Sequence, residues 1–220
     1  MPADTLTNHL AGKPLATQLD DFAAAYAAMA RFLLAPADTS LLSQLAAPGQ
    51  IEAWPLAGDP HTCRGCSHLA ASLVANEGVE VLNEDYQRLF VGPEHLLAPP
   101  YESVHRTVDR LLFDGPTFEV RALYRELGMQ APRLNREPDD HIGLEMSFLS
   151  LVCNRALEAF ESGSHDELEA MLAMQRRFLS EHLLRWGSDC LALVEAGAAT
   201  RFYRGVGALG LGLLVHASSW

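Results

Sequence analysis

The stretch LATQLDDFAAAYAAMARFLLAP, residues 15–36, decides the fold class of this chain. Its large apolar side chains recur at steps of three and four residues, a spacing that places them on one face of an α-helix. Pro36 follows, and a proline at this point is typical of a helix end. The stretch therefore predicts an amphipathic helix whose buried face is formed by Leu19, Phe22, Tyr26, Met29, Ala30 and Leu33.

The same spacing dominates the rest of the N-terminal half. Asp38, Thr39 and Ser40 are capping residues ahead of a short helix that ends near Leu45. A segment rich in proline and glycine follows at 48–60, and further helices are expected around 69–74 and 82–90. After Gly115-Pro116, Thr117 is expected to cap a helix that ends at Gly128.

The C-terminal half is also helical. A long helix is expected to start near Pro138, with Asp139 and Asp140 in its first turn, because proline and acidic residues both suit a helix N-terminus. Ser164 with Glu167 forms a capping-box pattern for a second helix that reaches residue 184. Two more helical stretches lie at 188–195 and 200–217. No run alternates with a period of two residues, so the sequence predicts an all-α protein.

Two loops divide this helical chain. Residues 91–106, VGPEHLLAPPYESVHR, carry three prolines and a glycine, which leave little room for regular structure. A second loop follows residue 128. We therefore expect a helical bundle of two lobes: an N-terminal lobe over 1–128 that contains the Pro-rich loop 91–106, a hinge at 129–137, and a C-terminal lobe over 138–220.

Composition excludes several classes of protein. The chain of 220 residues carries 16 basic and 28 acidic residues, a formal net charge of −12, so we expect no nucleic-acid partner. The first fifteen residues lack the apolar core of a signal peptide, and the longest apolar run, 205–217, is shorter than the ~20 residues that span a bilayer. Four cysteines do not indicate a disulfide scaffold. These features predict a cytoplasmic protein without stable membrane insertion.

One cluster suggests metal or redox chemistry. His61, Cys63, Cys66 and His68 place four soft ligands within eight residues. On one helix, however, the two cysteines share a face and the two histidines lie roughly opposite, because each residue turns by ~100°. Such a helix cannot bring all four to one zinc ion, which requires a tetrahedral set. A small helical metal- or redox-binding protein that uses Cys63 and Cys66 stays open as an alternative.

The pattern Gly205-x-Gly207-x-x-Gly210 matches a dinucleotide-binding fingerprint only by its spacing. No room follows it for a second strand and a ribose-binding acid. Close packing of a helix through small residues explains the three glycines better.

A polar cluster at Glu137-Pro138-Asp139-Asp140-His141 allows three interpretations. It can be a helix N-terminus whose acids satisfy free backbone amides. It can be an acidic corner able to receive a guanidinium group. It can also be the acid/base site of a helical enzyme, with His141 acting beside Glu137 or Asp140, and this third interpretation requires a closed pocket for a small ligand.

Three motifs together carry a resemblance to a known family. EDYQRLFVGP at 84–93 and PPYESV at 99–104 resemble the loop signature of the TorD/DmsD family, and NREPDDHIG at 135–143 is similar to its E-P-x-D-H motif. Members are cytoplasmic chaperones dedicated to molybdenum-cofactor oxidoreductases. The resemblance is strongest over residues 83–153 and gives no role to Cys63 or Cys66.

The resemblance implies binding without catalysis and without a cofactor or metal of the chain's own. Such a chaperone binds the twin-arginine leader of an apo catalytic subunit and holds it for cofactor insertion before export. It acts as a monomer or a domain-swapped dimer. Carried over by motif, the polar contacts are Asp140 and His141, with Glu137 assisting.

Loop residues supply candidates for the apolar and acidic walls of a groove beside these polar contacts. Tyr86 and Phe90 fit a core equally well, and Asp140 fits a helix cap. The loop candidates are Tyr86, Phe90, Pro100, Tyr101 and Glu102.

Overall fold

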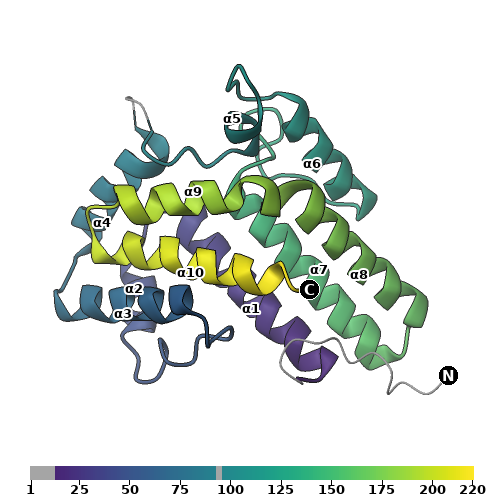
Figure 1. Ribbon diagram of the computed structural model, residues 1–220, viewed down its shortest axis with the longest axis horizontal. Coiled ribbons are helices and arrows are strands. Elements are labelled where there is room, and N and C mark those ends of the chain that lie inside the picture. Colours follow the sequence, from purple (N-terminus) through teal and green to yellow (C-terminus); the bar gives the residue numbers. More distant parts are fainter. Residues whose placement is uncertain (1–12, 93–95) are drawn as a thin grey trace.

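The computed structural model describes residues 13–92 and 96–220. Within these ranges the regular structure is helical, and the only β-type pairing is an isolated bridge between Tyr101 and His141. The all-α prediction is therefore confirmed (Figure 1). The elements are α1 (Leu15–Leu34), α2 (Thr39–Leu45), α3 (Pro60–Val74), α4 (Val79–Tyr86) with a π-helical extension (Gln87–Val91), α5 (Glu102–Arg106), α6 (Gly115–Glu126), α7 (Ile142–Ser162), α8 (His165–Phe178), a π-helical segment (Leu179–Leu183), α9 (Leu184–Gly197) and α10 (Arg201–Ala217).

Local sequence signals account for several of these boundaries. The Asp38 side chain accepts the backbone N–H of Leu41 and starts α2, as expected from the sequence. Asp59 accepts two N–H groups at the start of α3, where Pro60 occupies the first turn. Thr200 caps α10 through the N–H of Tyr203, and a left-handed glycine, Gly163, ends α7.

Helices from both ends of the chain pack against each other. α1 lies along α7, and α7 pairs with α8; α10 packs on both α3 and α9 (Figure 1). Elements that precede residues 129–137 thus pack against elements that follow them. The two lobes and the hinge at 129–137 stay predictions.

The core is aromatic at its centre. Tyr124, Phe148 and Phe178 form one cluster of rings, with centroids 4.8–6.2 Å apart, where α6, α7 and α8 meet. A second group joins Tyr86 and Phe90 to Tyr203 of α10. Rings of this size dominate the apolar area that folding buries.

The three glycines of the 205–210 pattern lie within α10 and serve packing. A Cβ at Gly207 would meet the backbone nitrogen of Glu195 on α9 at 2.6 Å, and one at Gly205 would meet the carbonyl oxygen of Gly65 on α3 at 3.0 Å. The interpretation of these glycines as close-packing residues is confirmed, because α10 lies between two helices that approach its backbone.

Four local expectations were wrong. The helix expected at Pro138 begins at Ile142, and α6 is capped by Asp114, not by Thr117. Ser164 precedes α8 but makes no capping bond. The Pro-rich loop contains the short helix α5.

Residues 164–184 are also not one uninterrupted α-helix, because a π-helical segment separates α8 from α9. Residues 1–12 and 93–95 lie outside the described ranges. The expectations for the N-terminal stretch and for this part of the Pro-rich loop fall on these residues. None of the helices in those ranges combines the length and the apolar character needed to cross a membrane.

Candidate functional site

Two of the resembling motifs meet at the start of α7. The N–H of Glu102 donates to the carbonyl of Asp140 at 3.0 Å, and the N–H of Ile142 donates to the carbonyl of Pro100 at 2.8 Å. This bridge fixes the end of the Pro-rich loop against α7. It also places the Tyr101 and His141 rings edge to face, with centroids 5.2 Å apart and both side chains half-buried.

The Asp140 carboxylate joins three elements. It is fully buried, and its Oδ2 accepts the backbone N–H of Ser103 at 2.7 Å while Oδ1 accepts the Thr117 hydroxyl at 2.7 Å. Ser103 lies in the first turn of α5, whose own N-cap residue offers no side-chain acceptor. Asp140 therefore caps α5 from a distance and ties α5 and α6 to the start of α7. Its expected place in the first turn of α7 was wrong.

Asp139 is also fully buried but contacts other residues. Its Oδ2 accepts two bonds from Arg121 of α6, from Nε at 3.0 Å and from Nη2 at 2.6 Å. Tyr124 donates its hydroxyl to the Asp139 carbonyl at 3.2 Å. Separating the partners of a buried ion pair would leave an uncompensated charge inside the protein. The Arg121–Asp139 pair therefore holds α6 against the segment that precedes α7.

Glu102 connects α5 to the π-helical segment. Its carboxylate is fully buried between the Arg106 guanidinium, which also donates to the Glu181 carbonyl, and the His182 ring, whose Nδ1 lies 2.9 Å from Oε2. The π-helical turn carries His182, and such turns are frequent at functional sites.

A further buried carboxyl group, Glu145, lies one turn along α7 from His141. The Trp186 indole N–H donates to its Oε2 at 3.3 Å. Burial raises the pKa of Glu145 well above its ordinary value, and the nearby charges of Glu102 and Asp140 raise it further. Both effects favour the protonated, uncharged form of the Glu145 carboxyl group.

His141 is the N-cap residue of α7. Its Nδ1 accepts the backbone N–H of Gly143 at 3.0 Å, so the proton of the neutral ring is on Nε2. Burial lowers the pKa of His141 to about 4. The His141 ring is therefore uncharged at neutral pH where it contacts the Tyr101 ring. Burial is also the main cause that raises the pKa of the Tyr101 hydroxyl.

The remaining sequence candidates differ in exposure. Glu137 is exposed and pairs with Arg133. Pro100 is buried, and its carbonyl accepts one of the two backbone bonds of the bridge. Tyr86 and Phe90 lie in the core, 5% and 3% exposed, and the Tyr86 hydroxyl donates to the Leu33 carbonyl at the end of α1. The structure thus brings Tyr101, His141 and Glu137 to the surface and buries the other candidates.

Several residues that build this site were absent from the sequence-based set. From α5, α6, α7 and the π-helical segment, five side chains or backbone groups bind or adjoin its carboxylates: Ser103, Arg106, Thr117, Glu145 and His182. Only Ser103 lies within a resembling motif. Arg106 lies four residues after Glu102, a spacing that indicates an ion pair on one helix. Thr117 and His182 are 23 and 80 residues from their partners, so local patterns carry no signal for them.

The cysteine cluster does not form a metal site in the described chain. Cys63 and Cys66 lie on α3 as free thiols, and Cys66 donates to the Ile51 carbonyl. His61 faces Arg64 of the same helix. Across residues 13–92 and 96–220, no three His, Cys, Asp or Glu side chains are grouped to hold a metal ion.

The acid/base alternative also lacks its expected geometry. The Asp140 carboxylate is engaged by Ser103 and Thr117, Glu137 by Arg133, and the Nδ1 atom of His141 by the backbone of Gly143. Among the described contacts, neither carboxylate bonds the His141 ring.

Comparisons with known proteins cover this same region. Residues 59–192, more than half of the chain, match the family described as nitrate reductase delta subunit. The chain is 36% identical over 130 residues to the Tat proofreading chaperone DmsD of Salmonella paratyphi A, a match that covers 59% of this chain and 57% of that protein.

Two further relatives are also chaperones by name. The Tat proofreading chaperone DmsD of Salmonella typhimurium is 34% identical over 139 residues, 63% of this chain and 61% of the relative. The chaperone protein TorD of Aliivibrio salmonicida is 29% identical over 125 residues, 57% of each chain. The matched part is thus less than two thirds of each of these relatives.

Proposed function

Because the chain belongs to the family of the nitrate reductase delta subunit and of the TorD and DmsD chaperones, we propose that it is a system-specific chaperone. In this proposal it binds the twin-arginine leader of an apo molybdenum-cofactor oxidoreductase subunit. It holds that subunit in the cytoplasm until the cofactor is inserted and then releases it for export. The mechanism is binding, not turnover.

The observation that carries this proposal is the bridge between Tyr101 and His141. Buried carboxylates fix the segments on both sides of the bridge, so two rings of mixed polar and apolar character are presented in a defined geometry. Preorganised aromatic surfaces of this kind lose little conformational entropy when they bind a peptide. A surface dedicated to one peptide segment needs such rigidity.

We assign two kinds of role to the site residues. Tyr101, His141 and the exposed Glu137 contact the leader. Asp140 and Glu102 act as positioning residues, because their oxygens already bind Ser103, Thr117, Arg106 and His182. Pro100, Tyr86 and Phe90 support this surface from beneath.

The net charge of −12 favours a basic leader over a phosphate-bearing partner. The chain works as a monomer, or as a dimer that exchanges its C-terminal helices through residues 129–137. That exchange would reproduce in trans the packing that α1 and α7 make in one chain.

Native capture tests this function. The chain is purified from cells that produce it during growth on an anaerobic electron acceptor, and its partners are identified by mass spectrometry. The proposal predicts a molybdenum oxidoreductase subunit that still carries its leader. A variant with both Tyr101→Ala and His141→Ala should lose this partner, whereas His165→Ala, on the exposed start of α8, should retain it. Recovery of no oxidoreductase subunit with the unchanged chain would contradict the proposal.

A further inference from the structure

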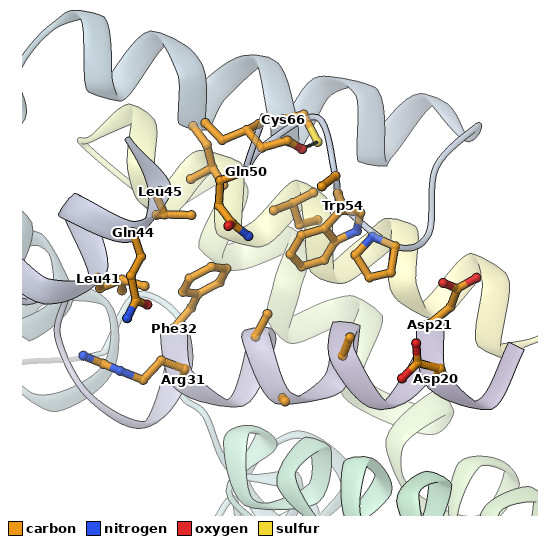
Figure 2. A pocket seen from close by; sticks show the side chains of 18 residues that line it. Asp20, Asp21, Arg31, Phe32, Leu41, Gln44, Leu45, Gln50, Trp54 and Cys66 are labelled. Atoms are coloured by element: carbon orange, nitrogen blue, oxygen red, sulfur yellow. Dashed lines mark hydrogen bonds between the residues drawn. The ribbon is translucent and has the colours of Figure 1, made fainter. Parts of the chain in front are cut away.

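A groove of about 670 Å³ lies between α1, α2, the segment 50–55 and α3, away from the carboxylate cluster described above. Figure 2 shows Trp54 and Phe32 projecting into the space between these elements, with α1 along one side. Its volume falls within the range that is typical of ligand-binding pockets. Most of its lining is apolar, from Phe32, Leu41, Leu45, Ile51, Trp54 and Leu69.

The sequence of α1 explains why the groove is open. Ala24, Ala27 and Ala28 line it at steps of three and four residues, so three small side chains share one face of the helix. Trp54 is held across from them by a loop that is anchored through the Ile51 carbonyl to Cys66 of α3. Large residues on one wall and alanines on the other leave a channel along α1.

One end of this groove is acidic. Figure 2 shows Asp20 and Asp21 at one end and Arg31 at the other. Asp20 is exposed and has no ion pair within the described ranges, and Asp21 pairs only with Lys13, whose side chain is 49% exposed. Exposed pairs of this kind contribute little, so an incoming guanidinium can replace Lys13 at small cost.

Polar atoms on the walls also lack partners. The Trp54 indole N–H and one terminal nitrogen of Arg31, Nη1, are buried without an acceptor among the described residues. Backbone carbonyls of a bound peptide are acceptors of the required kind. A purely hydrocarbon ligand would leave both donors unsatisfied.

One face of α1 connects the groove with the start of α7, next to the bridge. Ala27, Arg31 and Leu34 follow each other at steps of four and three residues. Leu34 contacts the start of α7, because a Cβ at Gly143 would meet the Leu34 side chain at 2.7 Å. The axial distance from Asp20 to Leu34 is about 21 Å, from fourteen residues at 1.5 Å each.

We propose that this groove holds the apolar segment of the leader, with the preceding arginines at Asp20 and Asp21 and the following residues directed toward Tyr101 and His141. The inference rests on the proposed function and adds a second, larger contact surface to it. A leader offers a basic stretch followed by an apolar one, which is the order of charge and apolar lining along this groove. The fully engaged Asp140 carboxylate cannot supply the acidic contact, whereas Asp20 can.

Cys66 provides a direct readout. It lines the groove, and Cys63 lies three residues earlier as an exposed thiol outside the lining. Burial raises the pKa of Cys66, so its alkylation is slow and sensitive to further covering. The leader peptide of the captured subunit should slow alkylation of Cys66 about tenfold and leave Cys63 unchanged. Protection of Cys66 that rises with protein concentration without peptide would place a second copy in the groove and overturn the inference.

Affinity measurements on three variants complete the test. Ala24→Gln with Ala28→Gln fills the groove with polar atoms and should weaken leader binding by about tenfold or more. Asp20→Asn should weaken binding of the natural leader more than that of a leader whose arginines are replaced by glutamine. Ala173→Gln is the matched control, since Ala173 is an exposed alanine of α8 outside the groove, and it should bind as the unchanged chain does.

The outcomes separate the two proposals. If the unchanged chain and the Ala24/Ala28 variant bind the leader equally well, and Cys66 stays reactive, the groove inference is wrong while the chaperone function stands. If the unchanged chain binds no leader, both are wrong.

Discussion

The Asp140 carboxylate accepts the backbone N–H of Ser103 at 2.7 Å across 37 residues of sequence. Together with the two backbone bonds of the bridge, this contact joins the Pro-rich loop to the E-P-x-D-H-like segment, and these carry two of the three motifs of the family resemblance. Asp140 therefore has a structural role that does not depend on contact with a ligand. Stability and binding must therefore be measured together at this residue.

Asp140→Ala should destabilise the protein. The change leaves the Ser103 N–H and the Thr117 hydroxyl without their acceptor in a buried site, at about 1–3 kcal/mol for each group. Urea unfolding of the variant measures the loss. Asp38→Ala, at the exposed cap of α2, is the control and should cost only about 1 kcal/mol. Equal losses in the two variants would contradict the three-element role of Asp140.

Glu145→Gln should change the pH dependence of stability. The folded-state pKa of Glu145 is raised, so the native protein holds a proton that the unfolded chain releases above pH ~4.3. The contribution of Glu145 to the free energy of unfolding is therefore complete below pH ~4.3 and declines as the pH rises toward the folded-state pKa. The variant should therefore gain stability over the unchanged chain by up to about 1.4 kcal/mol per pH unit within this window.

Denaturant unfolding at a series of pH values from 4 upward checks this. Glu158→Gln serves as the reference, because Glu158 is exposed on the same helix. A stability difference between Glu145→Gln and the unchanged chain that does not vary with pH would show that Glu145 is ionised in the folded protein.

His141 should destabilise the protein in mild acid. Its folded-state pKa is lowered from 6.5 to about 4, so the unfolded chain takes up a proton first as the pH falls below 6.5. The stability present above pH 6.5 is lost progressively toward pH 4, by about 3 kcal/mol at most. His141→Asn keeps a side-chain acceptor for Gly143 and removes the titration. Its unfolding free energy should vary less over this window, and an identical pH profile would refute the assignment.

Gly207→Ala should destabilise the protein although alanine favours helices by about 1 kcal/mol over glycine. The added Cβ would meet the Glu195 backbone at 2.6 Å, and backbone cannot move aside as a side-chain end can. Overpacking of this kind costs about 1–3 kcal/mol. Gly115→Ala has open space around it and should be near neutral by thermal unfolding. A stabilised Gly207→Ala would contradict the packing role of the α10 glycines.

The helical class and several helix boundaries could be predicted because they depend on local signals. The apolar period of 15–34 and the Asp38 cap act within a few residues, and the structure shows both of them. The close-packing reading of the 205–210 glycines also follows from composition and position alone.

The location of the site could be predicted from the sequence, but the contacts that its side chains make could not. Asp139 and Asp140 suit a helix N-terminus locally, yet their carboxylates bind Arg121, Ser103 and Thr117 on other elements. Thr117 was expected to cap α6, but Asp114 does so and the Thr117 hydroxyl bonds Asp140. Long-range partners decided these roles, and no local pattern reveals them.

The π-helical segment shows the same limitation. Residues 179–183 carry no glycine or proline to announce a change in helix type. Their turn coincides with the contact between His182 and Glu102, made across 80 residues. The groove beside α1 was not predicted either, because it depends on how Trp54 is placed over the alanine face.

Calorimetric titration of the purified chain with the leader of the captured oxidoreductase subunit tests the central claim most directly. The account predicts saturable binding that weakens by about tenfold or more when the two arginines of the leader are replaced by glutamine. Binding that is absent, or that is equally tight for both leaders, would contradict a chaperone that recognises a twin-arginine leader.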